Sequence, residues 1–305
     1  MNLRTILFFL VALAIFAICQ PALATWTIPV PVTEINTQYE EWSPFLSFDG
    51  LTLYFSRVRT NVPYYGRLYQ AERDSPSGPF ASVKEISELN QPNAYLLCPW
   101  VSPDNLRMYY QIQSSAAGTL LKFSERTSTN DPWPQGMDIS GLTQLGNDLM
   151  SPKLTADELT VFFHRHEIYG VQHDIWMATR PDRNSPFGQV RMLDEIDTAS
   201  YEVHPFPSAD GLKLYFASDR SGSYQLFMAT RESLDSPFGN IEHLSSFDAP
   251  TGYSCFPDPS YDGIALYFMR QAQDRSTRDI YVSYIPEPAT LLLLGLGAVV
   301  LKKKC

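Results

Sequence analysis

One phrase occurs five times along the chain, and this repeat constrains the fold more than any other feature of the sequence. In each copy a proline is followed five positions later by an aspartate, and an alternating apolar run comes directly after the aspartate. The prolines are Pro44, Pro99, Pro152, Pro205 and Pro257, at spacings of 55, 53, 53 and 52 residues. The aspartates are Asp49, Asp104, Asp157, Asp210 and Asp262. A period of about 50 residues is typical of repeat architectures in which each unit is one supersecondary element.

Each repeat divides into four strand-like pieces. The first surrounds the proline, and the aspartate with its following residue suits the tight turn of a hairpin. The second is the apolar run, such as residues 51–55. A third piece ends on arginine, as at Arg73, and a fourth follows a proline–aromatic pair such as Pro79-Phe80. Four short antiparallel strands per unit predict an all-β fold, a five-bladed β-propeller of four-stranded antiparallel blades.

The fifth repeat stops after its third strand, and the N-terminal segment can supply the missing piece. Trp26 precedes Pro44 by 18 residues, and the same interval elsewhere in the chain is 18 or 19 residues. We therefore predict that residues 26–35 form the outermost strand of the fifth blade and close the ring. Pro29 and Pro31 suit an edge strand, where a missing N–H is least costly.

The repeats resemble the TolB-type, WD-repeat-like propeller family. Residues 208–220, Ser-Ala-Asp-Gly-Leu-Lys-Leu-Tyr-Phe-Ala-Ser-Asp-Arg, are the best match, and residues 174–180 match the second half of the family's unit. The resemblance covers nearly all of residues 26–284 and implies the fold. It implies no single activity, because the family includes binding, scaffolding and some enzymatic members.

The N-terminal residues 1–24 are predicted to be a secretory signal peptide. Arg4 precedes an apolar run over residues 6–18, and Ala22-Leu-Ala24 forms a small-x-small cleavage site. A lipoprotein signal using Cys19 is the weaker alternative, because the bulky Ile18 before it is unsuited to that cleavage. The propeller is therefore expected to span residues 25–285.

The C-terminal residues 286–305 have a different character. Pro286, Glu287 and Pro288 precede an uncharged apolar run and three lysines. Thirteen apolar residues rise about 20 Å as a helix, short of the ~30 Å hydrocarbon core of a bilayer. The segment resembles the PEP-CTERM protein-sorting signal of Gram-negative bacteria. That resemblance implies export, at least transient anchoring in the inner membrane, and an exosortase-type sorting enzyme as partner. It also implies a final location on the cell surface or in the extracellular matrix, often linked with exopolysaccharide.

The charge of the chain limits its possible partners, and its cysteines limit the possible disulfides. The formal net charge is −10, and it falls to about −13 when the two ends are removed, because they hold four of the 23 basic residues and one of the 33 acidic residues. Such a surface repels a phosphate backbone, so we expect no nucleic-acid partner. Cys98 and Cys255 remain between the two ends. They occupy positions offset by one in different repeats, so we expect buried free thiols rather than a disulfide.

Two repeated sets of charged residues are expected to stabilise the blades. One aspartate per blade, each in a hairpin turn, should serve the turn rather than a shared calcium ion. The arginines that end the third strands should bond loop carbonyls or pack on the following proline–aromatic pair. They are Arg73, Arg126, Arg180 and Arg231.

Candidate ligand-binding residues come from the loops that should surround one mouth of the central channel. These are the segments that lead into each first strand and those that follow each second strand. The first group contributes Glu41, Trp42, Tyr95, Tyr201, Glu202, His204 and Tyr253, and the second contributes Arg57, Arg165, Arg220 and Arg270. Aromatic side chains beside carboxylates and guanidinium groups suit a sugar or peptide ligand.

The histidines are weak candidates for a metal site. His164 and His166 stand two apart on a predicted strand, so they point to the same face, and His173 lies across the next loop near Glu167. The alternative is a variable polar loop without a metal, which we favour. We expect neither a metal nor another cofactor.

Three functions remain open at this stage. The first is an exported binding module for a glycan or protein partner. The second is a carbohydrate-active hydrolase or lyase using carboxylates such as Glu41, Asp148 and Glu202. The third is a structural scaffold. The sequence favours the first and leaves catalysis undecided.

Overall fold

The computed structural model describes residues 26–285, with the exception of residues 64, 116, 147, 167–171 and 272–276. The predicted signal peptide and the sorting tail lie outside the described residues. The chain separates into two units, Ile28–Ser283 and the two terminal segments Met1–Thr27 and Tyr284–Cys305. Across the described part of the chain, none of the helices has the length and apolar character needed to span a bilayer.

The described strands follow the five repeats in order, four strands to each unit and antiparallel within it. Three units are separate four-stranded sheets, and the first two are joined by a short parallel pairing into one eight-stranded sheet. The first holds β2 (Glu40–Leu46), β3 (Thr52–Val58), β4 (Tyr65–Glu72) and β5 (Ala81–Glu85). The second holds β6 (Ala94–Val101), β7 (Arg107–Ser114), β8 (Gly118–Glu125) and β9 (Met137–Asp138). The third holds β10 (Leu149–Leu154), β11 (Thr160–His166), β12 (His173–Thr179) and β13 (Gly188–Met192). The fourth holds β14 (Glu202–Pro207), β15 (Lys213–Ser218), β16 (Gln225–Thr230) and β17 (Gly239–His243). The fifth holds β18 (Ser254–Pro259), β19 (Ala265–Gln271), β20 (Arg278–Tyr284) and β1 (Val30–Pro31).

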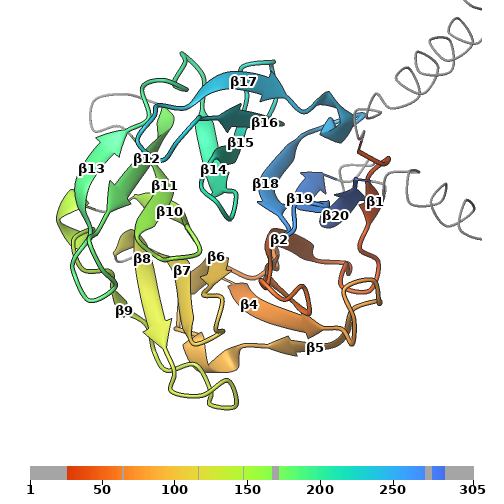
Figure 1. Ribbon diagram of the computed structural model, residues 1–305. Helices are drawn as coiled ribbons and strands as arrows, with labels where there is room; N and C mark the ends of the chain where they lie inside the picture. The colour runs from red at the N-terminus through yellow and green to blue at the C-terminus, as the bar shows by residue number, and fades with distance from the viewer. Residues whose placement is uncertain are drawn as a thin grey trace, which may run out of the picture. The chain divides into compact units, whose positions relative to one another are not determined.

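The units are arranged around a common centre, which confirms the predicted all-β propeller fold (Figure 1). The first strand of each unit, β2, β6, β10, β14 or β18, contacts the first strands of both neighbouring units in a closed cycle. Short 3₁₀ turns lie in the connections before three of these strands. They are η1 (Ser87–Leu89), η2 (Thr143–Leu145) and η3 (Ser245–Phe247).

The N-terminal segment completes the fifth blade at the predicted place. β1 runs antiparallel to β20, with Val30 opposite Val282, and the Val32 N–H donates to the Ile280 carbonyl at 2.9 Å. The regular strand covers two residues rather than ten, because Pro29 and Pro31 cannot donate to a ladder.

Apolar packing joins this closing segment to the first blade. Val32 and Ile35 are buried in one cluster with Leu53 and Phe55 of β3 and Tyr267 of β19. Burying each large apolar side chain stabilises the fold by roughly 1.5–3 kcal/mol. The closing segment therefore contributes through side-chain burial more than through its short ladder.

The repeated aspartates and arginines act together at the hairpin turns. In the first repeat Asp49 Oδ1 accepts from Ser47 Oγ at 2.6 Å and from the Leu51 N–H at 3.0 Å, and every other repeat has the equivalent pair. Arg73 Nε donates to the carbonyl of Gly50 at 2.7 Å, while its guanidinium carbon lies 4.5 Å from the Phe80 ring centroid. Arg126, Arg180 and Arg231 repeat this geometry. Both predicted stabilising roles are confirmed.

A bulge interrupts the first strand of every blade just before its proline. The residue at this position is never glycine, yet its φ is between 52° and 56°, a region that L-residues rarely occupy. The five residues are Ser43, Cys98, Ser151, His204 and Phe256. Pairing with the second strand shifts register at each of them. A bulge redirects a side chain, and these five converge from different blades, since Cys98 Sγ lies 3.4 Å from Ser43 Oγ and 3.2 Å from Ser151 Oγ. Cys98 and Cys255 are both buried free thiols, as predicted.

Candidate functional site

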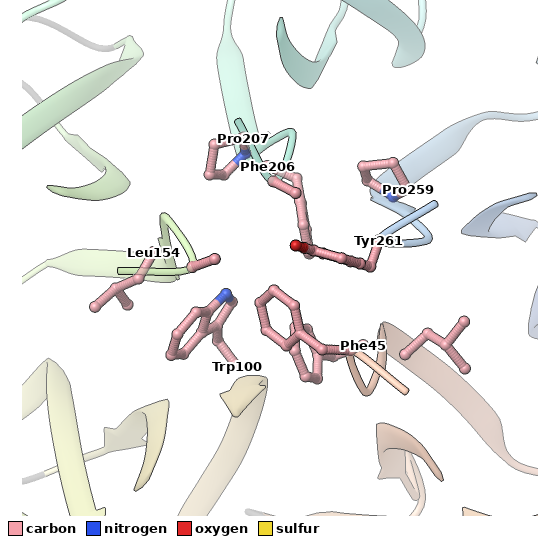
Figure 2. A pocket seen from close by; sticks show the side chains of 11 residues that line it. Phe45, Trp100, Leu154, Phe206, Pro207, Pro259 and Tyr261 are labelled. Atoms are coloured by element: carbon pink, nitrogen blue, oxygen red, sulfur yellow. The ribbon is translucent and has the colours of Figure 1, made fainter. Parts of the chain in front are cut away.

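The two ends of the central channel differ sharply in the space they leave. At the end formed by the aspartate turns, Phe45, Trp100, Phe206 and Tyr261 converge around a cavity of about 20 Å³ (Figure 2). The Phe45 ring centroid lies 6.0 Å from that of Trp100 and 6.2 Å from that of Phe206. A space of this size holds about one water molecule. This end is therefore closed to a larger ligand.

A lysine and an aspartate are buried behind this aromatic plug. Lys153 Nζ donates to the Pro99 carbonyl at 2.6 Å, and Asp258 Oδ2 accepts from the Leu46 N–H at 2.6 Å. Burial lowers the pKa of Lys153 to about 8 and raises the pKa of Asp258 to about 8, because each loses the hydration of its charged form. Lys153 Nζ and Asp258 Oδ2 therefore bind backbone groups inside the channel, and Asp258 Oδ1 has no partner among the described residues.

The opposite end holds a cavity of about 400 Å³, which we call the mouth cavity. Its lining comes from first strands, second strands and the starts of third strands. The lining residues are Trp42, Met150, His164, His173, Val203, His204, Tyr224, Tyr253, Cys255, Phe256, Met269 and Arg278. Among the described residues, neither aspartate nor glutamate lines this cavity.

Aromatic rings line one side of the mouth cavity in an unbroken series, the aromatic wall. Neighbouring ring centroids are 3.6–6.4 Å apart from Trp42 through the other rings to Tyr253, and Arg278 closes the series. Its guanidinium carbon lies 5.3 Å from the Trp42 ring and 5.6 Å from the Tyr253 ring. In order, the wall consists of Trp42, Phe256, His204, His164, His173, Tyr201, Tyr224, Tyr253 and Arg278.

The repeat explains why the wall forms on one side of the mouth. At the start of each third strand, one position lies seven residues before the repeated arginine. It is occupied by Gly66, Thr119, His173 and Tyr224, and Arg278 takes this place in the fifth blade. The side chain is therefore small in the first two blades and large in the other three. The bulge position follows a similar trend, with serine or cysteine in the first three blades and His204 and Phe256 in the last two.

The imidazoles of the wall are held neutral by burial. The pKa of His164 lies well below its usual range because the ring is desolvated, and His204 and His173 add to the effect. Desolvation also lowers the pKa of His204 to about 3, and it lowers the pKa of His173 together with the nearby His166. Arg278 is charged, but its Nη1 lies 2.5 Å from Glu40 Oε1 and its Nε donates to the Tyr253 hydroxyl.

Three buried polar atoms of the wall have no hydrogen-bond partner within the described part of the protein. They are Trp42 Nε1, His173 Nδ1 and His204 Nδ1. An unpaired buried polar atom costs roughly 1–3 kcal/mol, so native structures seldom leave several in one place without use. These three atoms border one cavity, so a ligand that offers hydrogen bonds could satisfy them together.

The weak metal candidates do not present a converging ligand set. His164 Nδ1 accepts from the His204 backbone N–H at 3.2 Å, so a neutral His164 ring carries its proton on Nε2 and offers no lone pair to a metal. The rings of His166 and His173 are 5.1 Å apart. Within the described ranges, no group of three possible ligand atoms within 4.8 Å of one another includes a histidine.

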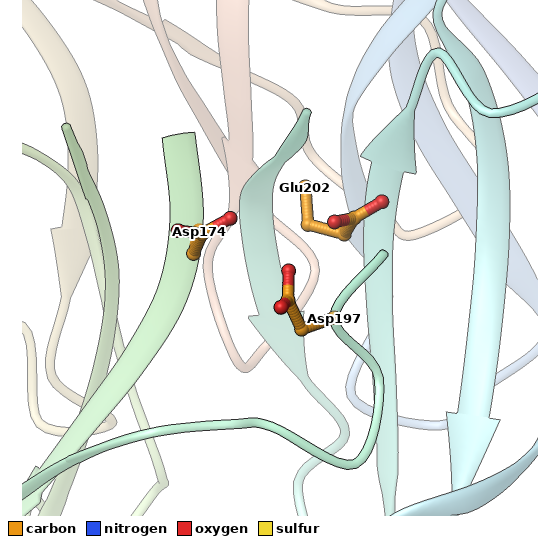
Figure 3. A group of neighbouring side chains, drawn as sticks. All are labelled: Asp174, Asp197 and Glu202. Atoms are coloured by element: carbon orange, nitrogen blue, oxygen red, sulfur yellow. The ribbon is translucent and has the colours of Figure 1, made fainter. Parts of the chain in front are cut away.

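Three carboxylates from the third and fourth blades and their connection do converge. Oxygens of Asp174, Asp197 and Glu202 lie within 4.8 Å of one another (Figure 3). Glu202, however, already accepts from Thr198 Oγ1 at 2.8 Å, Ser218 Oγ at 2.7 Å and Arg220 Nη2 at 2.9 Å. We therefore attribute Glu202 to the fold of its blade.

Six of the predicted site residues hold the segments that lead into the blades. Arg57 donates to the Ile35 carbonyl at 3.0 Å and to Glu41 at 2.7 Å. Arg165, Arg220 and Arg270 make equivalent bonds to the carbonyls of Leu145, Ile196 and Phe247 at 3.1, 2.9 and 2.7 Å. Glu41 and Glu202 are 0% exposed and bind both a threonine and an arginine in the same way.

The remaining predicted residues separate into two groups. Trp42, His204 and Tyr253 line the mouth cavity, and Tyr201 reaches it through His173 and Tyr224. Tyr95 lies away from them against Gly66, at the parallel contact between β4 and β6. Sequence reasoning missed Tyr224, Phe256 and Arg278. Comparing the repeats position by position, at the bulge and at the start of the third strand, would have pointed to them.

Comparison with known proteins identifies the tail and the fold. Residues 285–304 match the PEP-CTERM protein-sorting motif, which confirms the prediction for Pro286, Glu287 and Pro288. The motif indicates export and membrane-anchored sorting in Gram-negative bacteria, with an exosortase as the enzyme that recognises it. No protein of curated function matches the chain.

Solved glycoside hydrolases have a similar fold, and a solved TolB also matches the chain. The GH43_1 enzyme from Xanthomonas citri, solved with xylotriose, is 12% identical with a TM-score of 0.60, covering 86% of this chain and 91% of that one. The catalytic domain of the Coprinopsis cinerea GH62 α-L-arabinofuranosidase is 11% identical with a TM-score of 0.55, covering 85% and 96%. TolB from Acinetobacter baumannii is 16% identical with a TM-score of 0.48, covering 78% of this chain and 51% of that one. The chain thus spans about half the length of this TolB. At these identities the likeness is one of fold.

Proposed function

For this exported β-propeller with a C-terminal PEP-CTERM sorting motif, we propose a role as a binding module that holds a glycan in the mouth cavity. The mature protein consists of residues 25–285 and acts on the cell surface or in the extracellular matrix. An exosortase-type enzyme processes its tail. The observation that carries the proposal is the aromatic wall around a cavity of about 400 Å³.

The chemistry of the wall suits a sugar ring. Ligand sites of small molecules are concave, mostly apolar and about 300–1,000 Å³ in volume, with a few polar groups that fix orientation. The faces of Trp42, Tyr224 and Tyr253 can pack against the C–H faces of a pyranose. A sugar hydroxyl both donates and accepts, so it can serve an indole N–H and an imidazole nitrogen alike. The unpartnered atoms of Trp42 and His204 match this requirement.

The hydrolase alternative has less support than the binding role. Glycoside hydrolysis needs a pair of carboxyl groups on either side of the scissile bond. Glu41 and Glu202 are fully buried in hydrogen bonds to threonine and arginine, and Asp148 is exposed and not among the cavity residues. A scaffold without a ligand gives no role to the aromatic wall around a cavity of about 400 Å³.

The proposal is tested by incubating the processed protein with a panel of immobilised polysaccharides and assaying both retention and product. Retention without new reducing or unsaturated ends is the expected result. Release of such ends that stops in Glu202→Gln protein would instead establish a hydrolase or lyase. Absence of both retention and product across the panel would remove the glycan-binding role.

A further inference from the structure

A second cavity adjoins the mouth cavity at the first blade, and we call it the rim pocket. Its volume is about 280 Å³. It lies where the segment that leads into β2 meets the segment that follows β3, and Glu40 is paired with Val58 at the ends of these two strands. The rim pocket is lined by Gln38, Tyr39, Glu40, Val58, Thr60 and Asn61.

The two cavities meet at the ion pair between Glu40 and Arg278. Glu40 lines the rim pocket and Arg278 lines the mouth cavity, and Arg278 Nη1 lies 2.5 Å from Glu40 Oε1. Glu40 and Trp42 stand two apart on β2, so their side chains point to the same face of the strand. The rim pocket therefore begins beside Trp42, at one end of the aromatic wall.

The rim pocket is lined mainly by polar side chains, whereas the mouth cavity is lined mainly by aromatic and aliphatic ones. Its two amides, Gln38 and Asn61, and the hydroxyl of Thr60 belong to exposed residues. An amide both donates and accepts hydrogen bonds, as a sugar hydroxyl does. The two cavities thus offer complementary surfaces, one for the C–H faces of sugar rings and one for their hydroxyls.

The carboxylate of Glu40 offers one further acceptor at the junction. Its Oε1 is bound by Arg278, whereas Oε2 is buried and has no hydrogen-bond partner among the described residues. An ionised carboxylate only accepts hydrogen bonds, so the group that satisfies Oε2 must be a donor, as a hydroxyl is. Because Arg278 balances the charge of Glu40, a neutral sugar can occupy the junction without meeting a net charge.

A stacked arginine holds the rim pocket in shape. The Arg59 guanidinium carbon lies 4.5 Å from the Tyr39 ring centroid and 4.3 Å from the Tyr65 ring centroid. The Arg59 N–H also donates to the Tyr65 carbonyl at 3.0 Å. These contacts tie the segment before β2 to the turn after β3. A site that is held in shape before binding loses less conformational entropy when a ligand enters.

From this arrangement we infer that the protein binds an oligosaccharide segment across two subsites, the mouth cavity and the rim pocket, which are joined at Glu40. The inference rests on the proposed glycan-binding function. Sugar rings in the mouth cavity pack on the aromatic wall, and a hydroxyl at the junction donates to Glu40 Oε2. The hydroxyls of the following residues bind the amides of Gln38 and Asn61.

Two adjoining subsites have a defined signature in the affinities of fragments. A short fragment fills the mouth cavity alone, and a longer one gains affinity when it reaches the rim pocket. Affinity then stays level for fragments that extend beyond both subsites. The probes are size-separated fragments, from one sugar residue upward, made by partial acid hydrolysis of the polysaccharide that the panel retains.

The experiment is a calorimetric titration of each fragment against the processed protein and three variants. In the unmodified protein we expect affinity to rise by about tenfold or more at one fragment length. The Gln38→Ala/Asn61→Ala protein should lose most of this rise and bind the shortest active fragment normally. Trp42→Ala should weaken the binding of every fragment. Gln144→Ala is the control, because Gln144 is exposed in η2 and is not among the residues that line either cavity.

The outcomes separate the two proposals. Affinity that does not depend on fragment length would overturn the two-subsite inference and leave the glycan-binding function intact. A full rise in affinity in folded Gln38→Ala/Asn61→Ala protein would overturn the assignment of the rim pocket. Equal weakening of short and long fragments in that protein would contradict the division into two subsites. If the panel retains no polysaccharide, the function falls and the inference with it. Circular dichroism and the unfolding midpoint establish that each variant is folded.

Discussion

The two ends of the central channel are built from the same five strands, yet one is sealed and the other is open. At the sealed end the residue after each proline is large or charged, and Phe45, Trp100 and Phe206 fill the centre around about 20 Å³. At the open end the residue before each proline is small in three blades of five, and about 400 Å³ remains. In each blade, the residue after the proline therefore faces the sealed end and stabilises the ring. The residue before the proline faces the open end, where a ligand can bind.

The largest effect is expected from opening the ring itself, which both ends require. Deletion of residues 26–35 removes Val32 and Ile35 from a cluster that joins the fifth blade to the first. The lost burial of two side chains is about 3–6 kcal/mol, a large part of the roughly 5–15 kcal/mol that stabilises a typical domain, so we expect severe destabilisation. Urea denaturation followed by circular dichroism measures it. Ile28→Ala, at an 88% exposed position, is the control and should change little.

A substitution that creates a new cavity at the sealed end should lower the free energy of unfolding without a direct effect on the mouth cavity. Trp100 is 0% exposed and packs against Phe45 and Tyr109, so Trp100→Ala should cost about 3–5 kcal/mol of unfolding free energy. Glycan affinity of the folded fraction should stay within about twofold. A stability loss below about 1 kcal/mol would indicate that the plug is not tightly packed.

The neutral imidazole of His204 makes the mouth sensitive to acid. Its pKa is about 3 in the folded protein and near 6.5 when unfolded, so its stabilising contribution is complete above pH 6.5 and is lost as pH falls toward 3. Between pH 7 and pH 5 the loss is about 2 kcal/mol. Asparagine tolerates the φ of 54° at this position. The stability of His204→Asn protein should therefore fall about 2 kcal/mol less over this range, as measured by urea denaturation at both pH values.

The smallest effect is expected at the hairpin turns, away from both ends. Asp210 accepts from Ser208 Oγ at 2.6 Å and from the Leu212 N–H at 3.0 Å, and these bonds lower its pKa. Asp210→Ala should cost about 1 kcal/mol, the contribution of one or two partly exposed hydrogen bonds. Ligand affinity should not change. A loss of binding free energy larger than the loss of unfolding free energy would contradict a purely structural role for the aspartates.

The fold could be predicted from sequence because the same features are written five times. A proline, an aspartate turn and an apolar run recur, and the 18-residue interval from Trp26 to Pro44 located the closing strand. The length of the closing strand was harder to predict. Pro29 and Pro31 interrupt its hydrogen-bond ladder, and Val32 and Ile35 fix the segment by packing instead.

The site was less predictable because it depends on where side chains point. Glu41 and Arg57 have the residue types of a ligand site, yet they bind each other and the Ile35 carbonyl. Phe256 occurs in an apolar strand and is turned toward the mouth by a bulge that the sequence does not announce. Arg278 belongs to the wall because its blade places it between Trp42 and Tyr253. The sequence of one blade does not indicate such contacts, and only comparison of the five repeats points to the residues that make them.

The most direct test compares one aromatic residue from each end of the channel. Trp42 belongs to the mouth cavity, whereas Tyr261 is 59% exposed beside the sealed end. A glycan selected by the polysaccharide panel is titrated against Trp42→Ala and Tyr261→Ala proteins by calorimetry. We predict at least a tenfold loss of affinity for Trp42→Ala and unchanged affinity for Tyr261→Ala. Equal affinity of the two variants, or a loss confined to Tyr261→Ala, would contradict the mouth cavity as the binding site.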